Sequence, residues 1–408
     1  MRTGSVQAVV DLGNLSLDRG GRLLLQRAIA PLVPGERLEV RGSDPELPVH
    51  LRAWCRSRGY RFETGAVGEN GSGALAVVIG ESGSGGRWSG AEPAGRASRT
   101  ASGAVVDRPP ARWGLAPRGA SVEIGTPSFD FDLDAKEQVW SDDAARLYAQ
   151  ACAAQWDPEK AIDWRSSADL PGEIEQAVVQ IMTYLIENET AALVVPARFL
   201  GRIHPHFREV QQLLAIQVAD EARHIEVFTR RALLLGDSLG LSTAGGQESL
   251  KTLLDEPDFA IASFLLSVLG EGSFLSLLHF LDENAPDPVT RQVCRLAGQD
   301  EARHVAFGLS HLRRHLEIDP SLRARLAASV DRRHRALQHS AGLNEEVFDG
   351  LVLLAAGSWE PDRIAHGHEQ VAALQHDMDE GRRARLARLG FTQGEAEALS
   401  SLHTKNFM

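Results

Sequence analysis

The sequence predicts a multidomain α+β protein, in which a small two-layer α/β domain precedes an all-α four-helix bundle with extra helices at its C-terminal end. Three observations favour this fold class. Residues 1–82 alternate short β-type and helical runs, residues 83–124 are rich in Gly, Ser and Pro, and residues 125–408 show helical periodicity almost throughout. A chain of 408 residues is long enough for two or three domains.

The first domain has six short elements in the order strand, helix, strand, helix, strand, strand. Runs of β-type residues alternate with amphipathic segments, and turn residues separate them. This order predicts one small sheet with a layer of helices. The expected strands are Val6–Leu12, Glu36–Val40, Tyr60–Thr64 and Ala74–Gly80, and the expected helices are Arg22–Leu32 and Pro48–Gly59.

Several short motifs in this domain resemble the TusA-type sulfur-carrier family. They are Val10-Asp11, the run from Pro34 to Val40, Asp44-Pro45 and the run from Ala53 to Arg56. That family carries its active cysteine in a Cys-Pro-x-Pro motif at the start of the first helix, where this chain has Ser16 to Gly21 and no thiol. The resemblance therefore implies a degenerate copy that is kept for docking a partner. Cys55, in the second helix, is expected to be a half-buried packing residue.

The rest of the chain predicts a flexible linker at 83–124 and then a helical bundle. Its four long helices are expected at Pro171–Leu200, Pro205–Leu235, Pro257–Asp282 and Pro286–Leu316, each with Pro near its start. The connection over 236–256 is long and the other connections are short, as in a bundle with one long crossover. Further helices are expected at Ala135–Trp156, Ser321–Ser340, Asn344–Ser358, Asp362–Leu389 and Thr392–Leu402.

The pentapeptide Asp-Glu-Ala-Arg-His occurs twice, at residues 220–224 and 300–304. Each copy contains Glu-x-x-His, which places a carboxylate and an imidazole on one face of a helix. A single such pair is more often a solvated surface pair, but two copies on separate long helices favour a dinuclear metal site. Two pairs and one Glu from each of two further helices form its ligand set. The pentapeptides supply Glu221, His224, Glu301 and His304.

The two remaining ligands must lie on the first and third long helices. Glu271 is the only acidic residue between Asp258 and Asp282, and its neighbours are apolar. A carboxylate in that setting is costly to bury unless it is paired or bound to a metal. The first helix offers Glu187 and Glu189. Glu189 shares a face with the buried apolar stripe, so Glu189 is the preferred ligand and Glu187 the alternative.

With this ligand pattern, residues 130–320 resemble the ferritin-like di-iron oxygenase and oxidase superfamily. The resemblance implies a ferritin-like enzyme in which two iron ions use dioxygen as co-substrate to hydroxylate, N-oxygenate, desaturate or cleave a small organic substrate. Four carboxylates and two imidazoles suit iron, with manganese possible, better than structural zinc. The resemblance to this superfamily also implies that the Asp of each pentapeptide supports the His of the other copy. It further implies that the Arg side chains pair with these aspartates. These supporting residues are Asp220, Asp300, Arg223 and Arg303.

The sequence predicts an apolar substrate pocket. It also predicts that the histidines outside the two pentapeptides do not bind metal. The pocket is expected near Ala192, Phe264, Val268 and Phe274. Among the other histidines, we expect exposed side chains for His204, His206, His311 and His315, and a buried packing role for His279.

The charge, the cysteine pattern and the hydropathy of the chain limit the classes of partner and the location that are expected. The net charge of −12 argues against a nucleic-acid partner, because phosphate binding needs clustered Lys and Arg. The three cysteines form no CxxC, the N-terminus has no secretory pattern, and no apolar stretch approaches the roughly 20 residues of a membrane span. A cytoplasmic location is therefore expected. The protein is also expected to be a homodimer. Electrons are expected from a separate reductase or a chemical co-substrate. A partner docked by the first domain is a further expectation.

Other function classes remain open at this stage. A bundle with this ligand set could be a ferroxidase that handles iron, although the fused first domain suits shell assembly poorly. The metal could also be structural in a binding or regulatory protein that docks partners through its first domain. An RNA-modifying hydroxylase is a further alternative, because sulfur carriers of the TusA type serve tRNA thiolation.

Overall fold

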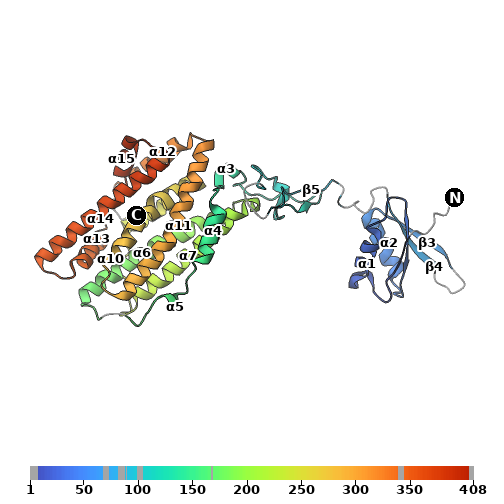
Figure 1. Ribbon diagram of the computed structural model, residues 1–408, viewed down its shortest axis with the longest axis horizontal. Helices are drawn as coiled ribbons and strands as arrows, with labels where there is room; N and C mark the ends of the chain where they lie inside the picture. Colours follow the sequence, from blue (N-terminus) through green and yellow to red (C-terminus); the bar gives the residue numbers. More distant parts are fainter. Residues whose placement is uncertain are drawn as a thin grey trace. The chain divides into compact units, whose positions relative to one another are not determined.

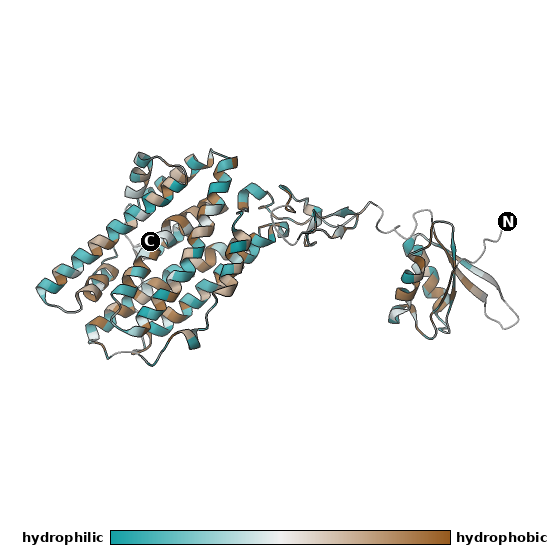
Figure 2. Ribbon diagram, viewed as in Figure 1, coloured by the Kyte–Doolittle hydropathy of each residue, from teal (hydrophilic) through white to brown (hydrophobic). Residues whose placement is uncertain are grey.

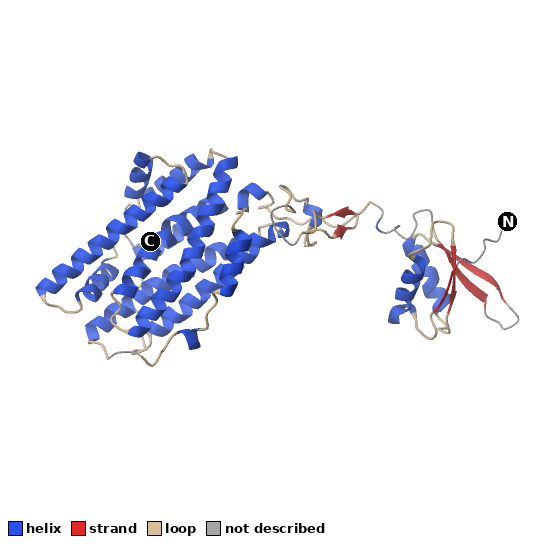
Figure 3. Ribbon diagram, viewed as in Figure 1, coloured by secondary structure: helices blue, strands red, loops and turns tan. Residues whose placement is uncertain are grey.

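The computed structural model describes residues 8–67, 73–80, 88, 90–98, 104–166, 169–338 and 344–403. The chain divides into two compact units, one of residues 1–94 with 120–127 and one of residues 95–119 with 128–408. Figure 3 shows strands in the small unit and an almost wholly helical large unit. A small N-terminal sheet followed by a mostly helical remainder agrees with the predicted α+β class.

The small unit is a four-stranded sheet with two helices on one face (Figure 1). Its strand order is β1-β2-β4-β3, with β1 parallel to β2 and β4 antiparallel to both of its neighbours. The sheet and the helices enclose a core in which Cys55 is 1% exposed rather than half-buried, and burial raises the pKa of its thiol to about 12. The elements are β1 Ala8–Asp11, α1 Arg22–Ile29, β2 Arg37–Arg41, α2 Leu47–Arg58, β3 Arg61–Val67 and β4 Gly73–Val78.

The prediction of a flexible linker over 83–124 is wrong for the part of it that packs on the helical unit. The Trp113 ring is buried and lies 5.3 Å from the ring of His206, and the backbone N–H of Val106 donates to His206 Nε2 at 3.0 Å. Arg118 forms a buried ion pair with Glu209. Composition could not reveal these partners, since they lie about a hundred residues away. Residues 81–87 and 99–103 are outside the described residues, and β5 Glu92–Pro93 pairs antiparallel with the distant β6 Ser121–Val122.

The large unit is built on four long helical segments that run side by side in Figure 1. They are α6 Gly172–Leu200, α7 Arg208–Ala232, the continuous run of α9 Phe259–Ser263, η5 Phe264–Gly270 and α10 Glu271–Glu283, and α11 Pro288–Ile318. These bounds lie within a few residues of the expected ones. Figure 2 shows hydrophobic stripes along these helices, as amphipathic packing requires. The segment η5 is π-helical, which the sequence pattern did not predict.

Smaller helices surround the bundle, and two of them differ from expectation. The helix expected over Ala135–Trp156 is broken at Trp140 into α3 Lys136–Val139 and α4 Ala144–Ala153, and the long crossover contains α8 Ala244–Leu254. The expected C-terminal helices are present. Short or peripheral elements are η3 Ala111–Trp113, α5 Pro158–Ala161, η4 Pro205–Phe207, α12 Leu322–Leu337, α13 Glu345–Ala356, α14 Pro361–Arg388 and α15 Gln393–Ser401.

Two apolar clusters fill the bundle on opposite sides of a polar layer. One cluster contains Phe199, Leu213 and Phe259, and the other contains Leu185 and Phe228. The long helices contribute to the first cluster from one side of the positions 189, 221–224, 271 and 301–304, and to the second from the other side. The pentapeptides and their partner carboxylates therefore form a buried polar layer across the middle of a hydrophobic core.

Two bundle segments are long and apolar enough to cross a membrane by length and composition alone. They are α6 and the run Phe259–Glu283, whose most apolar windows are 61% and 89% buried inside the unit. The expectation that no apolar stretch approaches the length of a span is therefore wrong. In the structure both segments are core helices, and they carry Glu189 and Glu271 into the polar layer.

Candidate metal centre

The two pentapeptides lie in the middle of α7 and α11, far from either helix end. Glu221, His224, Glu301 and His304 are buried there, at 2% exposure or less. The i, i+3 spacing turns the Glu and the His of each copy toward the same side of its helix. The two copies therefore present matching carboxylate and imidazole pairs to the interior of the bundle.

The six predicted ligands come together in two overlapping groups. Within each group, one ligand atom per residue lies within 4.8 Å of the others. One group adds Glu189 and His224, and the other adds Glu271 and His304, to the shared carboxylates Glu221 and Glu301. Two metal positions bridged by two carboxylates, each with one further carboxylate and one imidazole, match this arrangement.

The imidazoles face the carboxylates through their Nδ1 atoms. His224 Nδ1 lies 3.1 Å from Glu221 Oε2, 3.3 Å from Glu301 Oε1 and 3.5 Å from Glu189 Oε1. His304 Nδ1 lies 2.9 Å from Glu221 Oε1 and 3.3 Å from Glu301 Oε2. The contacts are therefore nearly the same in the two halves of the centre.

The structure separates the two candidates on the first helix. Glu189 is 1% exposed and belongs to the ligand cluster. Glu187 lies on the outer side of α6, where its carboxylate accepts a hydrogen bond from Gln247 Nε2 at 3.0 Å. Only Glu189 is placed to bind a metal in this layer.

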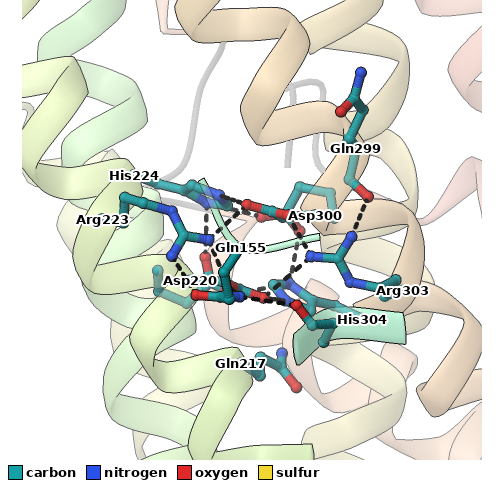
Figure 4. A network of polar contacts seen from close by, with 12 residues as sticks. Gln155, Gln217, Asp220, Arg223, His224, Gln299, Asp300, Arg303 and His304 are labelled. Carbon is teal, nitrogen blue, oxygen red and sulfur yellow. Dashed lines mark hydrogen bonds and ion pairs between the residues drawn. The ribbon is translucent and has the colours of Figure 1, made fainter. Parts of the chain in front are cut away.

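An aspartate–arginine network holds the far side of both imidazoles (Figure 4). His224 Nε2 lies 3.2 Å from Asp300 Oδ2, and His304 Nε2 lies 3.4 Å from Asp220 Oδ2, so each aspartate serves the histidine of the other copy. Because a carboxylate can only accept, Nε2 carries the hydrogen and Nδ1 of a neutral ring keeps its lone pair for a metal.

The arginines of the pentapeptides bind both aspartates. Arg223 Nη2 donates to Asp220 and, at 2.9 Å, to Asp300, while Arg303 contacts the same two carboxylates. Burial by itself raises the pKa of Asp300, but the hydrogen bonds from His224, Arg223 and Arg303 outweigh it and hold this pKa well below its usual range. The aspartates therefore stay ionised behind the imidazoles.

Sequence reasoning missed two residues that close this network. Gln155 Nε2 donates to Asp220 Oδ1 at 2.8 Å and its Oε1 accepts from Arg223 at 2.7 Å, as Figure 4 shows. Trp156 Nε1 donates to Asp300 Oδ2 at 2.8 Å, and its ring stacks beside His224 at 6.5 Å. Both follow α4 in a short turn. A Gln-Trp pair after an outer helix carries no periodic or motif signal that could have revealed this role.

Glu271 differs from the other ligands in its backbone setting. It is the first residue of α10 and follows directly on the π-helical η5. Such turns leave backbone groups outside the regular ladder and often mark functional sites. Here Arg385 Nε, from α14, donates to the carbonyl of Val268 at 2.7 Å. Gln217 Nε2 donates to Glu271 Oε1 at 3.2 Å and so fixes one of its oxygens.

Without bound cations, the buried carboxylates of the polar layer crowd negative charge together. Burial raises the pKa of Glu189 and Glu271 well above the usual range, and the charges of Glu221 and Glu301 raise both further. Burial would also raise the pKa of Glu221, but contacts with His304 and His224 lower it overall. Four carboxylates facing two imidazole lone pairs repel one another unless positive charge lies between them.

Several carboxylate oxygens point into the centre without a protein donor. Glu189 Oε1, Glu221 Oε1, Glu271 Oε2 and Glu301 Oε1 are buried and accept no hydrogen bond within the described part of the chain. Three of them lie 2.9–3.5 Å from an imidazole Nδ1, which carries no hydrogen in the neutral rings described above. Buried acceptors are rarely left unsatisfied. Two divalent cations would satisfy all four oxygens and balance four negative charges, so the residues present fit a dinuclear iron or manganese centre.

The residues expected to line a substrate pocket do not line a cavity that the structure describes. Ala192, Phe264, Val268 and Phe274 are buried, but none of them lines a described cavity. A small cavity of about 20 Å³ instead lies toward the start of α9. Its walls are Val195, Pro196, Phe199, Leu214, Gln217, Phe259, Ser263, Leu266, Ser267 and Phe307.

Five histidine predictions are wrong. His204, His206, His311 and His315 are buried rather than exposed, because tertiary contacts cover them. His279 is exposed and pairs with Glu283 on the outside of α10. The local sequence pattern could not show which of these histidines are buried, since the residues that cover them come from distant segments.

Comparisons with known proteins find no matching family model and no matching curated protein. Among solved structures, the chain is similar to a mutant R2-like ligand-binding oxidase with a Mn/Fe cofactor at 19% identity, over 64% of this chain and 94% of that chain, with a TM-score of 0.44. It is also similar to a Synechococcus protein with aldehyde deformylating oxidase activity at 20% identity, over 56% of this chain and 96% of that chain, with a TM-score of 0.40.

Proposed function

We propose that this protein is a non-haem dinuclear metal enzyme that uses dioxygen to oxidise a small organic substrate. The observation that carries the proposal is the buried centre itself, in which four carboxylates and two imidazoles converge in two overlapping groups. Two iron ions are the proposed cofactor, with manganese as the alternative, because this ligand set is hard to borderline. Hydroxylation, N-oxygenation, desaturation and oxidative cleavage all belong to this reaction class.

The ligands divide the work of holding the metal pair. Glu221 and Glu301, which belong to both ligand groups, would help to hold both metals, while Glu189 with His224 and Glu271 with His304 would each help to hold one. When bound, the pair supplies the electrons that reduce dioxygen. Four carboxylate charges balance two divalent cations, so the reduced centre is neutral and stable in an apolar core.

The surrounding residues keep the ligands in place and exclude water. Asp220 and Asp300 fix the tautomers and orientations of the two imidazoles, and Arg223 and Arg303 neutralise these aspartates. Gln217 holds one oxygen of Glu271, which leaves the other oxygen toward the centre. The apolar clusters on both sides protect a reactive oxidant from side reactions with water.

Electrons would come from a separate reductase or from a chemical co-substrate. We propose that the N-terminal α/β unit docks a partner, because its only thiol within the described residues is buried and its pKa is raised to about 12. A thiol in that state is a poor nucleophile, so sulfur transfer through Cys55 is not part of this proposal.

Metal loading tests the proposal directly. The full chain is purified without oxygen, loaded with ferrous iron, counted for metal, and then exposed to oxygen while absorbance and oxygen uptake are followed. We expect two metal ions per chain and uptake of oxygen in stoichiometric amounts. Accumulation of many ferric ions per chain would instead identify an iron-storage protein, and metal without oxygen uptake would identify a structural site.

Matched variants make the test specific. Glu271→Ala and His304→Ala should lower the metal content, whereas Glu187→Ala and His279→Ala should leave two metals bound, since these two side chains lie outside the centre. Unchanged metal content in the first pair would show that the centre is not where we place it.

A further inference from the structure

A second and larger cavity opens at the end of the bundle where α9 begins and α11 ends. Its volume is about 440 Å³. The rim is ionic, with Arg202 paired to Asp132 at 2.8 Å and Arg325 close to Asp258 and Asp319. The floor contains Phe259 and His315. This outer cavity is therefore polar at its mouth and partly apolar at its base.

The side chain of Phe259 borders both cavities. It lines the outer cavity and also the inner 20 Å³ cavity next to Gln217 and Ser267. Its ring packs against Phe199 at 5.2 Å and against His311 at 5.1 Å. A 20 Å³ space holds about one water molecule, so the inner cavity is nearly closed as it stands. Movement of one aromatic side chain would join the two spaces.

The inner cavity leads to the Glu271 half of the centre. Phe259, Ser263, Ser267 and Glu271 follow one another at intervals of four along the third segment, a distance of roughly 18 Å by helical rise. At the inner end, Gln217 lines the cavity and donates to Glu271. Gly308 allows this close packing, since an added Cβ would meet Ser267 Cβ at 2.7 Å.

Buried polar atoms beside the two cavities lack partners. Ser263 lines the inner cavity and His315 lines the outer one, whereas His311 lines neither and packs its ring against Phe259 and His315. Ser263 Oγ, His311 Nε2 and His315 Nδ1 are buried and have no hydrogen-bond partner among the residues that the structure describes. His311 Nδ1 lies 3.4 Å from the carbonyl of Trp140, which can only accept, so Nδ1 carries the hydrogen and Nε2 is a free acceptor. Burial lowers the pKa of His311 to about 3, which keeps the ring neutral. An unsatisfied buried acceptor needs a donor.

We propose that the two cavities form the substrate channel, with Phe259 as its gate, and that the substrate is a narrow apolar molecule with a hydrogen-bond-donating head, an alcohol or an amine. The apolar end passes Phe259 toward Glu271, and the head stays near His315, which lines the outer cavity, and near His311, which movement of Phe259 would uncover. Four acidic side chains and two arginines line the outer cavity. This excess of negative charge disfavours a carboxylate head. This inference rests on the proposed function, because it names the substrate class of the same centre.

Direct binding tests the channel without requiring turnover. Octylamine and 1-octanol are titrated into the full chain by calorimetry, with the protein both metal-free and metal-loaded in the absence of oxygen, and octanoate is the comparison probe. We expect the amine and the alcohol to bind at least tenfold more tightly than octanoate. Equal or tighter binding of octanoate would overturn the assignment of the head group.

Variants locate the binding. Ser263→Leu fills the inner cavity and should weaken octylamine binding at least tenfold, whereas Phe259→Ala should speed association by opening the gate. Phe280→Ala, a buried phenylalanine of the other apolar cluster, is the matched control and should change neither. Thermal melts establish that each variant is folded, and Phe259→Leu is a milder second variant. Unchanged binding in folded Ser263→Leu overturns the channel.

The outcome is separable from that of the proposed function. Binding that follows this pattern in a protein that takes up no oxygen would leave the channel standing and remove the oxidase. Oxygen uptake in a protein whose probe binding ignores Ser263 and Phe259 would remove the channel and leave the oxidase.

Discussion

The two halves of the metal centre carry the same pentapeptide but are built differently. Glu189 stands on α6, a helix that runs without interruption through the layer, whereas Glu271 begins α10 directly after the π-helical η5. Gln217 donates to Glu271, and the inner cavity borders that side. A repeated motif thus produces a nearly symmetric ligand set, and the third segment breaks the symmetry. The Glu271 half is the side on which we propose that the substrate approaches.

The π-helical segment is held by a side chain from a neighbouring helix, α14. Arg385 of α14 donates to the carbonyl of Val268, and Gly272 leaves room for it, because an added Cβ would lie 2.3 Å from Arg385 Nε. Burial lowers the pKa of Arg385 to about 10. A buried guanidinium whose Nη2 has no partner in the described structure is a costly feature. We infer that α14 is kept against the bundle partly to shape the Glu271 half.

Removal of a shared carboxylate should have the largest effect, because Glu221 and Glu301 belong to both halves. Glu301→Ala should lower the affinity for both metals by more than the roughly 10–100-fold that loss of a supporting residue costs. Metal counting after dialysis against a weak chelator measures this. Retention of two metals would show that Glu301 does not bridge them, and Glu187→Ala serves as the control.

Replacement of one supporting aspartate should weaken the binding of one metal more than the other. The loss of affinity should be smaller than for Glu301→Ala. Asp300→Asn should weaken the metal next to His224, and Asp220→Asn the metal next to His304, each by roughly 10–100-fold. Stepwise metal titrations of the two variants measure the loss. Equal weakening of both metals in each variant would contradict the crossed pairing of aspartate and histidine.

Disturbance of η5 should affect only the Glu271 half. Arg385→Met keeps an unbranched side chain that reaches the position of Nε but removes the hydrogen bond to Val268, so Glu271 should be less well positioned and one metal should bind several-fold more weakly. Arg388→Met, three residues away on the same helix, is the control. A loss that falls equally on both metals would mean that Arg385 acts on overall stability instead.

The smallest effect expected is a shift of stability with pH. Without metal, burial and neighbouring carboxylates raise the pKa of Glu189 and Glu271. Burial lowers the pKa of His224 and His304, but the surrounding carboxylates outweigh it and raise both. The native state then binds more protons than the unfolded state above ~6.5, the usual histidine pKa, so the free energy of unfolding falls as pH rises.

Metal binding has the opposite dependence on pH, because the ligands must be deprotonated. The difference in Tm between metal-loaded and metal-free protein should therefore widen from about pH 6 to about pH 8, by several degrees for each 1–2 kcal/mol gained. Differential scanning calorimetry at a series of pH values measures it. A difference that narrows as pH rises would contradict the raised pKa values in the empty centre.

Much of the bundle and its ligand set could be predicted from local patterns. Apolar residues at helical spacing predicted the long helices, and the two copies of Glu-x-x-His indicated which faces meet. Glu271 was recognisable because it is the only acid on a long apolar run. Gln155 and Trp156 were not recognisable, since their partners Asp220 and Asp300 lie 65 and 144 residues away. Nothing near them in the chain signals those contacts.

The sequence by itself predicted the helices and five of the candidate ligands, with Glu189 preferred over Glu187 for the sixth, because periodicity and spacing act within one or two helical turns. The aspartates behind the imidazoles were expected from the resemblance to the ferritin-like superfamily. Only the tertiary structure decided how the two halves differ. The π-helical turn before Glu271, the burial of His311 and the cavities on either side of Phe259 depend on side chains that meet across the bundle. Their energies come from packing and desolvation between distant segments, and local spacing carries no record of these contacts.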